Sequence, residues 1–279
     1  MITSAQQNYI DDHAYVPEHL PRYVTAISQT EPFLFGDYLV YGGKGHLTLI
    51  GYPLTEPFRE KQLLKALENA VNRLKPETIS LSSPSLPLSL KGYSQSPSDH
   101  YYRLDLSSLT ISQKLRNMLR RAARELSIGK NKLFDEQHKK LVEDFLKINR
   151  VDEATRSIFQ KIDKYLVSSD TAWIFDARNR GNELVAFDVA EFRPKGYSFY
   201  MFNFTSSDRY VPGASDLLLS EVIQQTKKES RKFINLGLGI DAGVTFFKKK
   251  WGGAAFLSHA YCFYRQSKKE SLEALLQKL

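Results

Sequence analysis

Three consecutive lysines follow a glycine-punctuated apolar segment near the end of this 279-residue chain. The stretch from Phe233 to Gly253 predicts a strand, a loop that contains Gly237 and Gly239, one basic helical turn and a double-glycine stop. Glycine lets a backbone approach another group closely, and clustered ammonium groups attract negative charge. The pattern therefore predicts a site for a large anionic ligand. The plainer interpretation is that the aromatic residues of the turn are core anchors and the lysines a solvated face.

A second anion-binding feature precedes that strand. The segment 209–216 predicts a helix start, whose first N–H groups, at Gly213, Ala214 and Ser215, have no partner inside the helix and lie at the positive end of its dipole. The alternative is that Ser215 or the residue after it merely caps the helix. The helix start and the lysine turn flank the same strand. We therefore expect an anion to lie between them, on one face of the domain, with Lys250 adding a phosphate contact.

Candidates for proton transfer are few. Asp188 and Glu191 lie on a predicted strand, 183–192, and we favour Asp188 as a base over Glu191. Strand alternation places Asp188 on a face that it shares with three apolar residues, namely Leu184, Ala186 and Ala190. A buried carboxylate there is either catalytic or a satisfied polar group. Tyr210 and Tyr261 are candidate proton donors. The six histidines have no ligand spacing, so no metal is expected.

A strongly basic helix is predicted over 112–126. Its apolar residues recur at helical spacing from Leu115 onward, while its remaining positions carry four arginines, namely Arg116, Arg120, Arg121 and Arg124. Such a face can bind an RNA backbone or a phosphorylated acceptor. A solvated face or ion pairs between domains explain it equally well.

The predicted elements form two groups. The first consists of a β-hairpin over 38–54, a helix over 58–75 and strands at 79–82 and 101–106. After the basic helix, the second consists of helices at 134–148 and 153–167, strands at 171–177, 183–192 and 197–204, a helix at 214–228, a strand at 233–238, a helix at 243–251, a strand at 254–264 and a tail helix at 268–279.

Composition limits the class of protein. Hydrophobic residues make up 42% and aromatic residues 12% of the chain, enough for two globular cores. The single cysteine, Cys262, excludes a disulfide framework and fits a reducing cytoplasm. No secretory signal and no apolar run of membrane-spanning length is present, so we expect a soluble protein. The net charge of +8 favours anionic partners, although an ordinary basic surface would also produce it.

The order of elements and the lysine turn resemble GNAT-type acyltransferases, and more narrowly the double-GNAT Fem peptidyltransferases. This resemblance implies an α+β fold of two tandem GNAT-like halves, 1–110 and 111–279, with mixed, mostly antiparallel sheets flanked by helices. Lys248 matches the lysine of the Phe-Lys pair in Fem-like proteins, which implies that it faces the reaction centre. Arg209 and Gly213 match the pyrophosphate-binding signature of GNAT enzymes in part, one residue out of register. The arginine-rich helix is similar to a segment between the Fem halves.

The implied activity is acyl or aminoacyl transfer, from acyl-CoA or aminoacyl-tRNA as co-substrate, to an amine or hydroxyl on a small or lipid-linked acceptor. Lys248 would stabilise an oxyanion or neutralise phosphate, with Asp188 and Tyr210 as further catalytic candidates. Two alternatives stay open: an aminoacyl-phospholipid synthase-like transferase, as in the lysyl-phosphatidylglycerol synthase C-terminal domain, and a non-catalytic RNA- or peptide-binding module. We expect an enzyme to have a gap between the strands of Leu236 and Phe256, and a binding module to have that gap filled.

Overall fold

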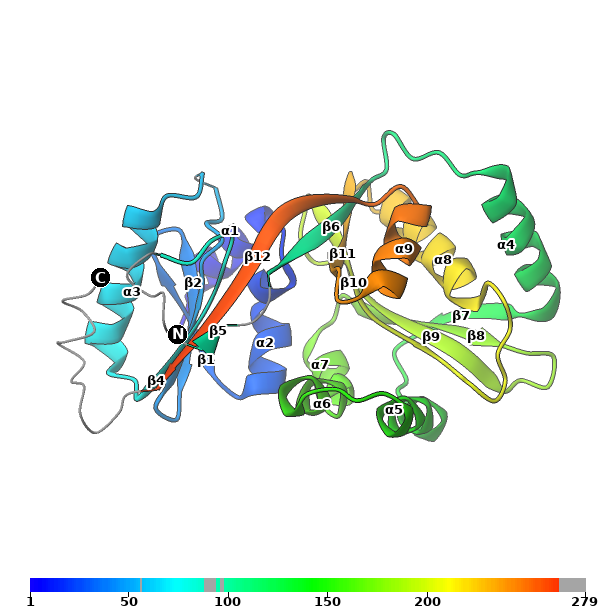
Figure 1. Cartoon of the computed structure of the whole chain (residues 1–279), viewed down its shortest axis with the longest axis horizontal. Coiled ribbons are helices and arrows are strands. Elements are labelled where there is room, and N and C mark those ends of the chain that lie inside the picture. The colour runs from blue at the N-terminus through cyan, green and yellow to red at the C-terminus, as the bar shows by residue number, and fades with distance from the viewer. Residues whose placement is uncertain (56, 88–93, 96–97, 266–279) are drawn as a thin grey trace.

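The protein is built on one continuous mixed sheet that runs through both halves of the molecule (Figure 1). The computed structural model describes residues 1–55, 57–87, 94–95 and 98–265. In this part of the chain the strand order is β1-β2-β3-β4-β12-β6-β11-β10-β9-β8-β7, and the short β5 pairs with β12. The predicted tail helix at 268–279 falls outside the described residues.

The N-terminal half contains a meander, a helix and a parallel strand. The predicted hairpin, helix and strand are all present, and β1 adds a strand that the sequence pattern did not indicate. The bounds are β1 (Glu31–Phe35), β2 (Tyr38–Gly43), β3 (His46–Ile50), α3 (Glu60–Leu74), β4 (Thr78–Ser83), β5 (Ser94–Gln95) and β6 (Asp99–Asp105). The unpredicted segments α1 (Ser4–His13), η1 (Pro17–His19) and α2 (Pro21–Ser28) precede the meander. They were not predicted because they are short. α1 has a capping box at Thr3, but it lacks the long apolar stripe that indicates a helix in a sequence.

The C-terminal half repeats the order of three strands, helix and strand. The bounds are α4 (Gln113–Glu125), β7 (Ser127–Asn131), α5 (Glu136–Ile148), α6 (Glu153–Phe159), α7 (Ile162–Ser168), β8 (Ala172–Arg178), β9 (Leu184–Glu191), β10 (Tyr197–Thr205), α8 (Ala214–Lys228), β11 (Phe233–Leu238), α9 (Ala242–Lys250) and β12 (Ala254–Arg265). Two predictions were wrong here. The helix expected over 153–167 is two short helices, and β7 was missed because Gly129 weakens its strand pattern.

The two halves exchange strands. β6 comes from the N-terminal half of the chain but lies between β11 and β12. β12 comes from the C-terminal end, pairs with β6 over 254–259 and then with β4 over 260–265. Each half therefore contributes a strand that completes the sheet of the other (Figure 1). The division at residue 110 stays a prediction, since β6 precedes that point and pairs beyond it.

Helices cover both faces of the C-terminal sheet. One core packs α4, α8 and the end of α9 against it, through residues such as Leu115, Leu218 and Trp251. On the opposite face, α5 and α7 pack through Leu141 and Tyr165, and α2 adds Tyr23 at its edge. A third core lies under α3 in the N-terminal half. Below, the first two surfaces are called the α8 face and the α7 face.

The two halves differ at their parallel strand pairs. β3 and β4 pair over five consecutive positions, from His46 to Ile50, and Gly51 N extends the contact to the Ser82 carbonyl at 2.7 Å. The equivalent pair, β10 and β11, is in register only over 197–199 and 233–235. Beyond these residues β10 has an irregularity at 200–202 and β11 bends at Gly237, whose φ is 78°. The sheet is therefore closed in the first half and opens between β10 and β11 in the second.

We predict that Gly51→Ala destabilises the protein, because a β-carbon there would lie 2.5 Å from Ser83 Cβ and 3.1 Å from the Ser82 carbonyl oxygen. The expected loss in the free energy of unfolding is about 1–3 kcal/mol, the usual cost of overpacking a core. Gly129→Ala is the control, since its β-carbon would meet nothing within 4 Å. Urea unfolding measures both variants. Equal stability of the two would show that the closed strand pair tolerates separation.

Candidate active site

A buried polar network lies on the α8 face beside the opening between β10 and β11. Asp188 of β9 is fully buried and accepts hydrogen bonds from Asn203 Nδ2 at 2.6 Å and from the Tyr200 hydroxyl at 3.0 Å. Its Oδ2 is buried without a hydrogen-bond partner. Burial raises the pKa of this carboxyl well above its usual range, and the nearby Asp216 carboxylate adds to the effect. Asp188 therefore holds a proton more readily than an exposed aspartate does.

The neighbours of Asp188 differ in one respect from those predicted. Ala186 and Ala190 share its face, but Leu184 packs with Phe187 on the α7 face. The register between β8 and β9 shifts at Ala177, and this irregularity turns Leu184 over.

The network extends to the start of α8. The Ser215 hydroxyl donates to Asn203 Oδ1 at 3.1 Å and lies 3.0 Å from the Thr205 hydroxyl. The N-cap of α8 is Gly213, with a φ of 88° and no side-chain capping bond. The alternative in which Ser215 or Asp216 caps this helix is therefore wrong, because both side chains bond elsewhere. The helix begins with backbone N–H groups that no side chain caps, as an anion-binding helix start requires, although the Ala214 N–H donates to the Val211 carbonyl at 3.1 Å.

The end of α9 packs against this helix start. Asp216, in the first turn of α8, accepts a hydrogen bond from Trp251 Nε1 at 2.9 Å and pairs with Lys250 Nζ at 2.6 Å. Lys250 was predicted to contact a donor phosphate, but in this state its charge is already matched by Asp216. The pair nevertheless ties the lysine turn to the helix start on one face.

Lys248 is a residue of α9, and its ammonium lies beside the end of β11 on the same face. Only 4% of it is exposed, and its ammonium donates to the Leu238 carbonyl and lies 5.9 Å from the centre of the Tyr102 ring. Burial lowers the pKa of this ammonium to about 8, against the opposing effect of Asp99 and Asp241. Lys248 is thus a desolvated cation that loses its proton readily. The alternative of a solvated lysine face is wrong for this residue, although Lys249 is exposed.

Side chains of the protein itself lie close to Gly237 of β11 and to Gly239, which follows the strand. A β-carbon on Gly237 would lie 3.7 Å from Lys248 Nζ, and one on Gly239 would lie 2.6 Å from Asp99 Oδ1. The Asp99 carboxylate accepts hydrogen bonds from the backbone N–H groups of Gly239 and Ile240, at 3.2 and 2.9 Å. Gly237 therefore leaves room for the Lys248 ammonium. Gly239 leaves room for the Asp99 carboxylate, which holds the loop before α9.

Other predicted residues lie apart from this network. Arg209 is ion-paired with Glu183 at 3.1 Å, and Tyr210 is 66% exposed in the loop before α8. Tyr261 lies 3.0 Å from the Ser80 hydroxyl in the N-terminal half. Glu191 accepts four hydrogen bonds inside the α7 face, from the Tyr165 and Ser169 hydroxyls and from two backbone N–H groups, which is a structural arrangement.

The basic face of α4 adjoins the start of α8. A β-carbon on Gly213 would lie 2.9 Å from Met118 Cγ, so the loop before α8 rests on α4. The four arginines of α4 are exposed. Within the described residues, none of them has a carboxylate partner. The expectation of ion pairs between domains therefore fails, and the charge is free to meet an external anion.

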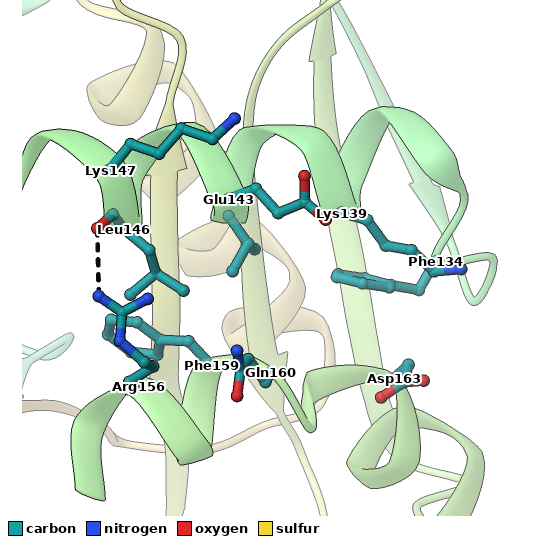
Figure 2. Close-up of a pocket in the computed structure, with 10 residues that line it drawn as sticks. Phe134, Lys139, Glu143, Leu146, Lys147, Arg156, Phe159, Gln160 and Asp163 are labelled. Atoms are coloured by element: carbon teal, nitrogen blue, oxygen red, sulfur yellow. Dashed lines mark hydrogen bonds between the residues drawn. The ribbon is translucent and has the colours of Figure 1, made fainter. Parts of the chain in front are cut away.

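The expected gap between the strands of Leu236 and Phe256 is absent, because β6 fills it. By the criterion stated from the sequence, a filled gap favours a binding module. The criterion named the wrong strand pair, since the opening lies one strand further along, between β10 and β11. Two grooves on the described surface are lined by neither Lys248 nor the start of α8. One lies between α5 and the α6–α7 segment (Figure 2), and the other beside the β2–β3 turn.

The described part of the chain contains neither a metal-binding cluster nor a membrane-spanning helix. No cluster of His, Cys, Asp and Glu side chains is arranged to hold a metal ion there. None of its helices combines the length and apolar character that a bilayer crossing needs.

Solved structures share this architecture across almost the whole chain. The L-PGS structure from Bacillus licheniformis aligns with a TM-score of 0.60 at 16% identity, covering 99% of this chain and 95% of that one. FemX aligns with a TM-score of 0.61 at 10% identity, covering 93% and 96%. A tandem GNAT protein from the clavulanic acid biosynthesis pathway aligns at 0.51 and 11%, covering 84% and 79%. The chain has the tandem GNAT fold. The sequence itself matches no protein-family model and no curated protein.

Lys248 should carry a measurable stability penalty that depends on pH. Its pKa is lower in the folded state than in the unfolded chain, so the penalty is fully present below about pH 8 and disappears as the pH rises towards the unfolded value of 10.5. Lys248→Met should therefore gain more stability over wild type at pH 6.5 than at pH 9.5. Chemical unfolding at both values measures the difference. A constant difference would mean that Lys248 is not desolvated.

Proposed function

We propose that the protein transfers an acyl or aminoacyl group from a polyanionic donor held on the α8 face. The observation that carries the proposal is the opening between β10 and β11, which coincides with an uncapped helix start and a desolvated lysine. Donor N–H groups and a cation at such a point stabilise phosphate or a developing oxyanion. The fold shared with FemX and L-PGS agrees with a group-transfer enzyme, and it leaves the substrates open.

Of the two donor classes, we favour aminoacyl-tRNA over acyl-CoA. The exposed arginines of α4 extend the positive surface beyond the start of α8, where a single pyrophosphate would not reach all of them. The Arg209 signature for coenzyme A is out of register, and Arg209 itself is paired with Glu183. A soluble aminoacyl transferase and an aminoacyl-phospholipid synthase would use the same donor.

Only the C-terminal half offers this geometry. In the N-terminal half β3 and β4 stay paired through Gly51, where there is no room for a side chain, let alone a ligand. α3 covers that closed pair through Leu63 and Leu67. The N-terminal half therefore serves as a partner that supplies β6 and the α1–α2 region.

The second candidate is a binding module without catalysis. The aromatic rings of Tyr200 and Phe247 stack at 6.3 Å beside the opening, and neither of the two grooves described above reaches Lys248. A module of this kind would bind tRNA through α4 and transfer nothing. A measurement of group transfer therefore distinguishes the two candidates, whereas a measurement of tRNA affinity does not.

Lys248→Ala should reduce transfer from a mixture of ¹⁴C-aminoacyl-tRNAs by roughly 10²–10³-fold, the effect of removing one positioned electrostatic group. Its thermal midpoint should be retained, because the lost packing of this buried side chain offsets the gain from removing a desolvated cation. Lys249→Ala, on the exposed side of the same helix, is the matched control. Full activity in Lys248→Ala would remove the lysine from the site, while no transfer by wild type would leave the binding module.

The triple variant Arg120/Arg121/Arg124→Gln should weaken tRNA binding and flatten its dependence on salt. Each phosphate contact contributes about 0.7–0.9 log units of affinity per log unit of salt. Lys139/Lys140/Lys147→Gln is the charge-matched control, since these lysines lie on α5 and pair with carboxylates of their own helix. Fluorescence anisotropy at two salt concentrations gives both slopes. Absence of tRNA binding to wild type at low salt would shift the donor to acyl-CoA.

A further inference from the structure

Glu18 brings a carboxyl group into the junction between the two halves. It lies in the short helix η1, between α1 and α2. Its Oε1 accepts a hydrogen bond from the Tyr101 hydroxyl at 2.8 Å, while Oε2 is buried without a partner. The residue as a whole is only half-buried. An unmatched carboxyl oxygen in such a position costs stability, so it calls for a functional explanation.

Tyrosines surround this carboxyl from four elements. They are Tyr23 of α2, Tyr41 of β2, Tyr52 after β3 and Tyr101 of β6, and the charge of Glu18 helps to raise the pKa of each phenol. The hydroxyls of Tyr41 and Tyr52 are occupied, since they donate to the carbonyls of Glu18 and Ser258 at 2.8 and 2.9 Å. Aromatic rings around a carboxylate form a surface that attracts cations.

The protein supplies no cation to this group. In the described part of the chain no lysine or arginine is ion-paired with Glu18. The adjacent His19 points its Nε2 to the Tyr52 carbonyl at 2.8 Å, and burial lowers its pKa to about 4, so it is neutral. Burial also raises the pKa of the Glu18 carboxyl above its usual range. A positive charge from outside would reverse that effect.

Glu18 lies across the sheet from Lys248. Tyr101 and Tyr102 are neighbours on β6, and successive side chains of a strand point to opposite faces. Lys248 stands over Tyr102, whereas Tyr101 turns to Glu18. Tyr101 is also the register partner of Leu238, whose carbonyl accepts the Lys248 ammonium. The lysine and the carboxyl therefore flank the same end of β11 from its two sides.

Tyr23 links the carboxyl to the other border of the opening. Its ring lies 6.1 Å from Phe202, which is part of β10, and 5.1 Å from Tyr165 of α7. It is half-buried, so this side of the junction keeps some contact with solvent. A donor held on the α8 face leaves the opposite face for the acceptor. The acceptor then approaches the opening between β10 and β11 past Tyr23 and Glu18.

We propose that Glu18 and its tyrosines form the acceptor subsite and bind a primary ammonium group, so that the acceptor is an amine and not an alcohol. This inference rests on the proposed transfer function. In the step, an N–H bond of the ammonium breaks and its proton goes to Glu18 Oε2. The freed nitrogen lone pair attacks the acyl carbonyl, a C–N bond forms, and the ester C–O bond to the donor breaks. The second proton that the nitrogen loses goes to the departing donor oxygen, which leaves as a hydroxyl. Burial raises the pKa of the Glu18 carboxyl, which makes it a stronger base than an exposed glutamate and favours that proton transfer.

The first experiment needs neither donor nor turnover. Protein labelled with ¹³C at glutamate carboxyl carbons is titrated with pH, and the Glu18 resonance is the one missing in Glu18→Gln, or in Glu18→Asp if the glutamine variant does not fold. Saturating methylammonium chloride should lower the Glu18 midpoint by at least about one pH unit, a tenfold preference for the ionised form. Methanol, and potassium chloride at equal ionic strength, should leave it unchanged. An unchanged midpoint in methylammonium, or an equal effect of potassium, overturns the subsite.

The second experiment separates this inference from the proposed function. Glu18→Gln should bind tRNA like wild type but lose about 10²–10⁴-fold in transfer to a primary alkylamine, the usual value of a general base. Transfer to hydroxylamine should be largely kept, because that nucleophile is already unprotonated at neutral pH. Wild-type rates with alkylamine in Glu18→Gln would reject the subsite while the transferase stands. Absence of transfer by wild type would reject the function, while the titration still tests the subsite.

Discussion

The reciprocal exchange of β6 and β12 is the constraint on which the rest of the structure depends. β12 pairs first with β6 and then with β4, so one strand carries the backbone hydrogen bonds of both halves. Removing either exchanged strand would leave a long unpaired edge in the middle of the sheet, which proteins avoid. The exchange also fixes the site, because β6 presents Tyr102 to one face and Tyr101 to the other. A change in its register would move both together.

Within this continuous sheet the two repeats differ in the pairing of their parallel strands. Both follow the order of three strands, helix and strand, yet β3 and β4 remain paired and β10 and β11 separate. The difference arises in local sequence. Gly51 lets the first pair continue, since its backbone lies against Ser82 and Ser83, whereas the left-handed backbone at Gly237 turns β11 away from β10. The N-terminal repeat supplies a closed strand pair and the strand β6. The C-terminal repeat supplies the opening between β10 and β11.

Local pattern predicted much of the C-terminal half. The helix 214–228 and the strand 233–238 were predicted with the bounds that they have, because an amphipathic run after Pro212-Gly213 and a β-branched apolar segment are strong signals. The placement of Lys248 and the helix start on one face followed from that order of elements. The insertion of β6 could not be predicted, since it depends on pairing between segments more than 100 residues apart. The role of Ser215 was missed because its partner Asn203 lies on another element, β10, although only 12 residues separate the two.

The surroundings of Glu18 could not be predicted from local sequence pattern. The only signal in the sequence is a glutamate between Pro17 and His19 in an otherwise apolar segment, and such a residue is most often exposed. Its burial results from tyrosines that come from four separate elements, three of which belong to the sheet or its loops. The sheet also explains why Lys248 and Glu18 do not neutralise each other. A direct pair would satisfy both charges and leave the protein more stable, whereas a strand between them keeps a desolvated ammonium on one face and an unmatched carboxyl on the other. Reactants that bring the opposite charge to each face would then offset the cost of burying the ammonium and the carboxyl apart from each other.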